Sequence, residues 1–137
     1  MKAISIVAVV DVVGALANDT LTGNLYLLDN NKSNGSTDEG TDVLKTRVKK
    51  GDQLVWVVQT LECEAYASIA GIDVDSKFAE YIEPQQKTYQ GTNVTYWSAT
   101  IKKDLDVPVP YNLRFRLASR ASDIATSSSP LLLGSAA

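Results

Sequence analysis

RVKKGDQLVWVVQTL, residues 47–61, is the stretch that decides the fold. Its Lys-Gly-Asp turn is followed by Gln53–Thr60, a run rich in Val, Leu and Trp. Such side chains fit a pleated, buried surface, so the run predicts a central strand with a neighbour on each side. Because alternate side chains of a strand point to opposite faces, Leu54, Trp56 and Val58 should share one face. A helix is the alternative, but the run is short, Val-rich and begins after a turn.

Other segments show the same alternation. Strands are expected over residues 3–12, 24–28, 43–48, 64–74, 94–101 and 111–117, and one short helix over 76–82. The segment 111–117 alternates most regularly, with Leu113, Phe115 and Leu117 facing the core and Arg114 and Arg116 facing solvent. Connections are expected over 11–23, 29–42, 84–91 and 104–110.

Six to eight short strands with at most one short helix predict an all-β fold, a single antiparallel β-sandwich. Its form should be jelly-roll-like or immunoglobulin-like. The length of 137 residues predicts one domain, 1–137, in which 118–137 is a loosely patterned C-terminal segment. The net charge of −3 argues against nucleic acid, because phosphate backbones require a basic surface.

Histidine is absent from the sequence, which removes the commonest general base and the commonest transition-metal ligand. With one cysteine and one methionine as well, neither a blue-copper site nor a usual zinc site can be assembled. The single Cys63 excludes an intramolecular disulfide, and we expect it to be a small buried hydrophobe. No cofactor is expected, apart from a calcium ion considered below.

The N-terminus imitates a secretory signal, since Lys2 precedes an apolar segment and Ala15-Leu16-Ala17 resembles a cleavage site. Asp11 interrupts the apolar segment, however, and the chain begins at Met1. We therefore expect a cytoplasmic protein. No apolar run approaches the roughly 20 residues that a membrane span requires.

Short motifs along the chain resemble the PixA/AidA family of bacterial proteins, also called inclusion-body family proteins. They are GNLYL (23–27) with DN (29–30), GS (35–36), EG (39–40), GDQLVW (51–56), IDVD (72–75), YW (96–97), PY (110–111) and SPL (129–131). These pieces occur in the family's order and cover the chain from about residue 20 to 133.

The resemblance implies a small, abundant protein of Gram-negative bacteria. Some members of that family accumulate as intracellular inclusions, and others are induced by quorum sensing in bacteria associated with invertebrate or plant hosts. The resemblance supplies no catalytic residues that could be assigned to positions of this chain.

The polar loop 29–42 is a candidate calcium site, because calcium takes six to eight oxygen ligands and such loops often supply them. The candidate ligands are Asp29, Asn31, Asp38, Glu39 and Asp42. The loop does not fit the EF-hand template at the glycine and glutamate positions, but calcium-dependent lectins use similarly Asn-, Asp- and Gly-rich loops. The alternative is a long solvated loop, since these residues are also the ones that turns need.

Tyrosines form a second candidate site, because sugar rings stack on exposed aromatic side chains. Trp56 and Trp97 are expected in the core. Tyr81, Tyr89 and Tyr96 remain as a candidate ligand-binding surface.

Two pairs of carboxylates, Glu62 with Glu64 and Asp73 with Asp75, share a strand face and could in principle catalyse glycoside hydrolysis. We interpret them as solvated charges instead. The serines at 127–129 have no histidine to activate them. The sequence therefore predicts that the chain is not an enzyme.

Basic residues are expected at turns and on the solvent faces of strands, where charge discourages edge-to-edge pairing of sheets. They are Lys49, Lys50, Lys102, Lys103, Arg114 and Arg116. The leucine triplet 131–133 either packs against its own sandwich or docks on a neighbouring molecule.

The function predicted from these observations and the resemblance is that of a non-enzymatic bacterial β-sandwich protein. It would act by self-association, as a homo-oligomer, or by binding a ligand. The alternative is a lectin-like carbohydrate-binding module that uses calcium in the 29–42 loop.

Overall fold

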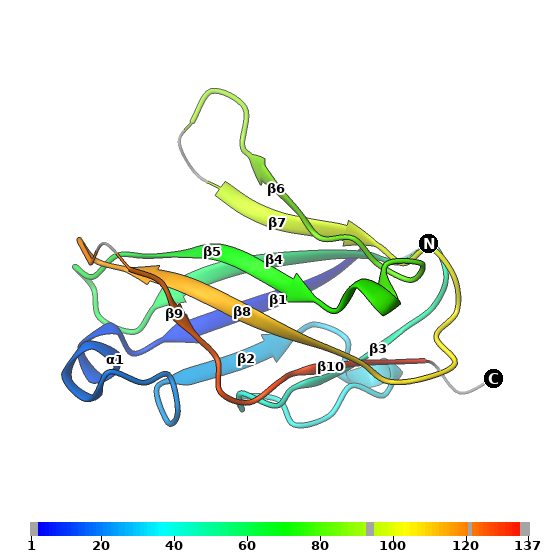
Figure 1. The fold of residues 1–137 in the computed structure, drawn as a ribbon, viewed down its shortest axis with the longest axis horizontal. Coiled ribbons are helices and arrows are strands. Elements are labelled where there is room, and N and C mark those ends of the chain that lie inside the picture. The colour runs from blue at the N-terminus through cyan, green and yellow to red at the C-terminus, as the bar shows by residue number, and fades with distance from the viewer. Residues whose placement is uncertain (1–2, 93–94, 121, 135–137) are drawn as a thin grey trace.

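The structure is a computed structural model that describes residues 3–92, 95–120 and 122–134. Its first sheet has the strand order β2 (Leu25–Asp29), β1 (Ala3–Val10), β4 (Gln53–Thr60), β7 (Thr95–Thr100) and β6 (Gln85–Thr88). The second sheet has the order β3 (Lys45–Val48), β10 (Leu131–Gly134), β8 (Val109–Leu117) and β5 (Ala67–Val74), with β9 (Ile124–Ala125) also paired to β8. The chain crosses repeatedly between the two layers, which lie face to face (Figure 1).

One hydrophobic core fills the space between the sheets. β1 and β4 contribute alternate side chains from the first sheet, and β8 contributes Tyr111, Leu113, Phe115 and Leu117 from the second. The Trp56 ring meets the Tyr111 ring edge-on, with the ring centroids 5.6 Å apart. Trp56 Nε1 donates a hydrogen bond of 3.3 Å to the Tyr111 hydroxyl. The core is thus tied together across both layers.

The predicted all-β sandwich is confirmed. β4 has the bounds expected for the central strand and lies between β1 and β7. The sheets are not purely antiparallel, however, because β1 pairs in parallel with β4 and β10 pairs in parallel with β3. β1 and β4 run in parallel because the chain crosses to the second sheet at β3 before it returns as β4 beside β1. The described residues form ten strands, more than the six to eight predicted.

The helices also differ from expectation. Residues 76–82 contain only a 3-10 turn, Ser76–Phe78, whereas α1 (Val12–Asn18) occupies a segment expected to be strand and connection. Asp11 begins this helix, since its carboxylate accepts the Gly14 N–H at 2.9 Å. A further 3-10 turn, Lys32–Asn34, lies in the polar loop. Among the described residues, no helix combines the length and the apolar character that a membrane crossing would need.

Three strands lie where no regular structure was predicted. β6 lies in the expected connection 84–91, and β9 and β10 lie in the loosely patterned 118–137. β6 escaped prediction because all four of its side chains are exposed, so it shows no alternation. Val94, the first residue of the predicted strand 94–101, lies outside the described residues, as do residues 121 and 135–137 of the C-terminal segment.

The leucine triplet packs against its own molecule. As β10 it pairs with β3 on one side and with β8 on the other, and Leu132 is completely buried. Of the two alternatives open from the sequence, the structure therefore shows the intramolecular one.

Candidate functional site

The hairpin formed by β6 and β7 projects from the sandwich (Figure 1). β7 pairs with β4 only through Gln53–Trp56 of that strand, so the distal part of the hairpin continues without support from β4. Trp97 points inward, because its Nε1 donates a hydrogen bond of 3.0 Å to the Ile69 carbonyl of β5. The residues that alternate with Trp97 therefore lie on the opposite, outer face of the sheet, where Tyr96 and Thr100 are partly or fully exposed and Ser98 is covered by its neighbours.

The outward residues form a surface that we call the hairpin face. It consists of Gln85 and Lys87 from β6, Tyr89 just beyond it, and Tyr96, Ser98 and Thr100 from β7. Strand register pairs Gln85 with Ser98 and Lys87 with Tyr96. Side chains that lie opposite each other in such a ladder are close enough to act together.

Two aromatic rings lie at the distal end of the hairpin face. The Tyr89 and Tyr96 ring centroids are 4.5 Å apart, with 33° between the ring planes. Tyr89 is 47% exposed. A partly exposed aromatic pair of this kind offers an apolar surface bordered by hydroxyl groups, which suits a ligand with one apolar and one polar side.

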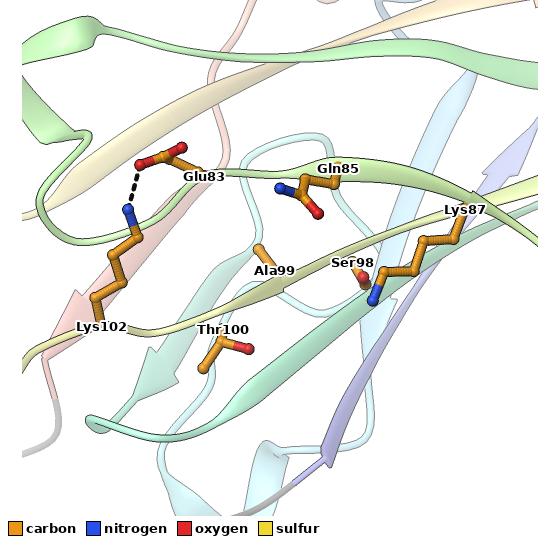
Figure 2. Close-up of a pocket in the computed structure, with 7 residues that line it drawn as sticks. All are labelled: Glu83, Gln85, Lys87, Ser98, Ala99, Thr100 and Lys102. Carbon is orange, nitrogen blue, oxygen red and sulfur yellow. Dashed lines mark hydrogen bonds and ion pairs between the residues drawn. The ribbon is translucent and has the colours of Figure 1, made fainter.

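A pocket of about 210 Å³ lies on the same hairpin and reaches the tyrosine pair through Lys87, which is opposite Tyr96 in the strand register. Figure 2 shows the residues that line it. It is lined by Glu83, Gln85, Lys87, Ser98, Ala99, Thr100 and Lys102. Figure 2 shows the Lys87 side chain reaching from β6 across towards Ser98 on β7. Amide, hydroxyl and ammonium groups thus converge on one concave surface, which is how small-molecule sites fix a ligand's orientation.

The pocket carries positive charge on a chain that is acidic overall. Its lining contains two lysines against one glutamate. Lys102 Nζ is paired with Glu83, and it also donates to the Ala79 carbonyl at 3.1 Å. Lys87 has no carboxylate partner within the described part of the chain. Its charge is therefore available to a ligand.

Tyr81 does not join the other two predicted tyrosines. It is buried, and its ring packs against Phe78 at 6.5 Å between centroids and beneath Lys103 Nζ at 4.8 Å. The candidate stacking surface therefore consists of Tyr89 and Tyr96 without Tyr81. Burial of Tyr81 follows from the chain direction after Ser76–Phe78, which turns this side chain inward.

The five candidate calcium ligands of the 29–42 loop are largely occupied by protein partners. Asp29 accepts the Asn31 N–H at 2.9 Å and the Thr46 hydroxyl at 2.8 Å. Asn31 is buried, and its amide donates to the Arg47 carbonyl at 2.6 Å. Asp38 forms an ion pair with Lys45 at 2.7 Å.

Glu39 and Asp42, the other two candidates, differ from each other. Glu39 Oε1 accepts the Asp29 N–H at 2.8 Å, whereas its buried Oε2 has no hydrogen-bond partner. Burial, followed by the neighbouring Asp29 carboxylate, raises the pKa of Glu39. Asp42 lies in the turn that precedes β3. Within the described ranges, no three His, Cys, Asp or Glu side chains form a group suited to hold a metal ion.

Three of the four carboxylates in the two candidate pairs, Glu62, Asp73 and Asp75, form hydrogen bonds that stabilise the fold. Glu62 accepts the Val12 N–H at 2.9 Å and so caps α1 together with Asp11. Hydrogen bonding with Glu62, and then with the Gly14 N–H, lowers the pKa of Asp11. Asp73 binds Arg114 through two contacts of 2.7 and 3.2 Å, and Asp75 accepts the Lys77 N–H. Glu64 is exposed and does not meet Glu62 in a cleft.

The remaining polar candidates also have structural partners. The Ser127 hydroxyl lies 2.8 Å from that of Thr22, and Ser129 donates to Asn112 at 2.8 Å. Cys63 is exposed, so the expectation of a buried cysteine is wrong. The cause is local, since Cys63 lies in the turn between β4 and β5, beyond the reach of the core.

The basic residues lie at turns and on solvent faces, as expected. Arg116 and then Arg114 hold the pKa of Asp123 below its usual range. Lys103 pairs with Glu80 at 2.8 Å, and this contact raises the pKa of Lys103. Lys49 and Lys50 lie in the turn before β4, where Lys50 N donates to Asp104 at 2.8 Å.

The sequence indicated two of the six residues of the hairpin face, Tyr89 and Tyr96. It missed Gln85 and Lys87 because β6 was not recognised as a strand, and it placed Ser98 and Thr100 in a predicted strand without selecting them as ligand-binding residues. The register of β6 with β7 brings these residues onto one face, and residue spacing in the sequence does not reveal that register.

The two-layer fold defines this chain as a small β-sandwich protein. The structure is similar to that of an inclusion body protein (PixA) from Burkholderia cenocepacia J2315, with a TM-score of 0.68 and 15% sequence identity. The similarity covers 99% of this chain and 95% of that chain. The resemblance indicated by the sequence motifs is thus confirmed at the level of the fold.

By sequence, residues 2–123 match a family described as a domain of unknown function, DUF8788. The chain belongs to this family. No curated protein sequence gives a significant match.

Proposed function

We propose that the chain is a non-enzymatic binding protein whose ligand is a carbohydrate and whose binding surface is the hairpin face. The observation that carries this proposal is the Tyr89–Tyr96 pair beside a polar pocket. The rings supply an apolar stacking surface, and the pocket supplies hydroxyl, amide and ammonium groups that can bind sugar hydroxyls.

The absence of catalytic equipment in the described residues supports binding without chemistry. The chain contains no histidine, and Glu62, Asp73 and Ser129 are engaged in hydrogen bonds that hold the fold. An acid–base pair would need carboxylates with suitably shifted pKa values facing one cleft. The pocket of the hairpin face has a single carboxylate, Glu83, which is paired with Lys102.

A glycan array tests the proposal. We expect the protein to bind at least one class of glycan, and binding to be reduced more than tenfold by Tyr89→Ala or by Tyr96→Ala. Tyr66→Ala is the matched control, because Tyr66 is 61% exposed but lies in the loop between β4 and β5. The absence of any glycan ligand would refute the carbohydrate proposal.

Self-association is a second candidate function, favoured by the outer face of β2, β1 and β4. Leu28, Val7 and Val57 lie in one row across these strands, and Tyr26 and Val9 lie beside each other in the next row. Tyr26 and Leu28 are each 40% exposed. The outward positions of the three strands carry no charged side chain, so two copies could meet face to face without electrostatic repulsion.

Light scattering at high protein concentration tests this second candidate. We expect a homo-oligomer for the unmodified protein and a monomer for Leu28→Lys, because burying an unpaired ammonium is costly. Val107→Lys is the control, since Val107 is 46% exposed but lies in the loop between β7 and β8. A monomeric unmodified protein would rule out self-association through this surface.

The biological setting that the PixA/AidA resemblance implies belongs to the same proposal. We propose a cytoplasmic protein of a host-associated bacterium, produced under quorum-sensing control. Fractionation of cells and measurement of transcript level against cell density would test these two points.

A further inference from the structure

We propose that the hairpin face selects saccharides that carry a carboxylate, such as uronic acids, and that Lys87 is the residue that determines this selectivity. The inference rests on the carbohydrate-binding proposal above and names the ligand class within it.

The position of Lys87 on the hairpin is the first argument. Register places Lys87 directly opposite Tyr96, and Tyr89 lies two residues further along on the same face. A pyranose ring stacked on the tyrosine pair would therefore lie next to the strand position of Lys87, whose long side chain could bring its ammonium to the edge of the ring. A uronic acid carries its carboxylate at the edge of the ring, where this ammonium can reach it.

The charge of the pocket is the second argument. Lys102 is neutralised by Glu83, whereas Lys87 has no ion-pair partner in residues 3–92, 95–120 and 122–134. An unneutralised ammonium beside a polar concave surface attracts an anion, and charge-assisted hydrogen bonds are stronger than neutral ones. The chain has a formal net charge of −3, so this local positive charge opposes the overall charge.

The neutral groups of the pocket are the third argument, because they distinguish a sugar from a simple anion. Gln85 and Thr100 supply an exposed amide and an exposed hydroxyl group, each able to donate and to accept, and the Ser98 hydroxyl lines the pocket from a buried position. Sugar hydroxyls need partners of this kind, whereas an inorganic anion needs donors only. The tyrosine pair adds an apolar surface that an inorganic anion would not use.

Isothermal titration at low salt with an oligogalacturonate and the matched neutral oligogalactose tests the inference. We expect the acidic oligosaccharide to bind at least tenfold more tightly. Lys87→Gln should reduce this preference to about one, because it should weaken binding of the acidic oligosaccharide about tenfold more than binding of the neutral one. Lys50→Gln is the matched control, since Lys50 is an exposed lysine in the turn before β4. Circular dichroism would establish that both variants are folded.

The outcomes separate this inference from the proposed function. Equal binding of the two oligosaccharides, or a preference that survives Lys87→Gln, overturns the selectivity inference and leaves carbohydrate binding intact. Binding of neither oligosaccharide, together with an empty glycan array, overturns both. Inorganic phosphate is the third arm: displacement of the acidic oligosaccharide by equimolar phosphate would show a general anion site and refute saccharide selectivity.

Discussion

The Trp56–Tyr111 contact joins the two sheets by a hydrogen bond between buried side chains. Both side chains are almost completely buried, and the indole N–H has the Tyr111 hydroxyl as its partner. Burial raises the pKa of Tyr111, so the hydroxyl stays protonated over the whole physiological range. It is a neutral hydrogen-bonding group and takes no part in acid–base chemistry.

Tyr111→Phe should therefore destabilise the protein by about 1–3 kcal/mol, because the buried indole N–H loses its partner. Urea unfolding followed by tryptophan fluorescence measures the change. Tyr66→Phe, which removes an exposed hydroxyl, should leave the unfolding midpoint unchanged. An unaltered midpoint for Tyr111→Phe would mean that the hydrogen bond contributes nothing to stability.

At Glu39, the folded state disfavours the ionised form of the carboxyl group. Its folded-state pKa is raised by burial and by Asp29, so the folded protein binds the proton more tightly than the unfolded chain does. The group therefore favours folding below the ordinary glutamate pKa, and this contribution is lost as the pH rises through the raised value.

Glu39→Gln should for this reason make the protein more stable than the unmodified chain at about pH 7, and the gain should shrink near pH 4. Urea unfolding at both pH values measures it. Glu64→Gln, at an exposed site, is the control and should show little change at either pH. A loss of stability in Glu39→Gln at neutral pH would contradict the assignment.

β10 is the element on which the second sheet depends. It fills the position between β3 and β8, and Leu132 is completely buried while Leu131 and Leu133 are only partly so. β10 therefore pairs with a strand along each of its two edges and places one side chain, Leu132, in the core.

Leu132→Ala should destabilise the protein by about 2–5 kcal/mol, as expected for a buried leucine truncated to alanine. Leu131→Ala is the matched control on the same strand and should cost clearly less, because its side chain is only partly buried. Thermal or urea unfolding measures both. Equal effects of the two variants would contradict the placement of Leu132 in the core.

Elements with strong alternation were predictable from the sequence, and the others were not. Gln53–Thr60 was predicted with its bounds and as a central strand, though without the identity of its neighbours, and β8 was predicted with its inward and outward residues. β6 has four exposed side chains, and α1 depends on Glu62, which lies far away in the sequence. Hydrophobic periodicity reveals neither a strand whose side chains are all exposed nor a helix cap that comes from a distant residue.

Partner choice between strands was not predictable for the same reason. The parallel pairs β1–β4 and β10–β3 follow from where the chain crosses between layers, and the period of a strand is the same whichever neighbour it has. For the same reason, the candidate site could be predicted only in part. The tyrosines were recognisable by type, but the register that places Lys87 opposite Tyr96 exists only in the folded sheet.

For the whole molecule, the contacts made by the 29–42 loop allow a prediction of how calcium affects the melting temperature. Asp29, Asn31 and Asp38 are engaged with protein groups that fasten the loop to β3 and to the residues around it. A cation would have to break these contacts to gain its ligands. We therefore expect the melting temperature to be the same in calcium and in a chelator, and a rise in calcium would show that the loop rearranges to bind it.

The position of β10 has a consequence for biosynthesis. A ribosome produces β3 (Lys45–Val48) well before residues 131–134, so until β10 has been made this strand holds unsatisfied backbone groups along the edge that β10 will cover. Nascent chains on neighbouring ribosomes then present open edges to one another, which is the situation that promotes aggregation during translation. Translation of this protein thus includes an interval prone to aggregation that lasts until β10 has been made and has paired with β3.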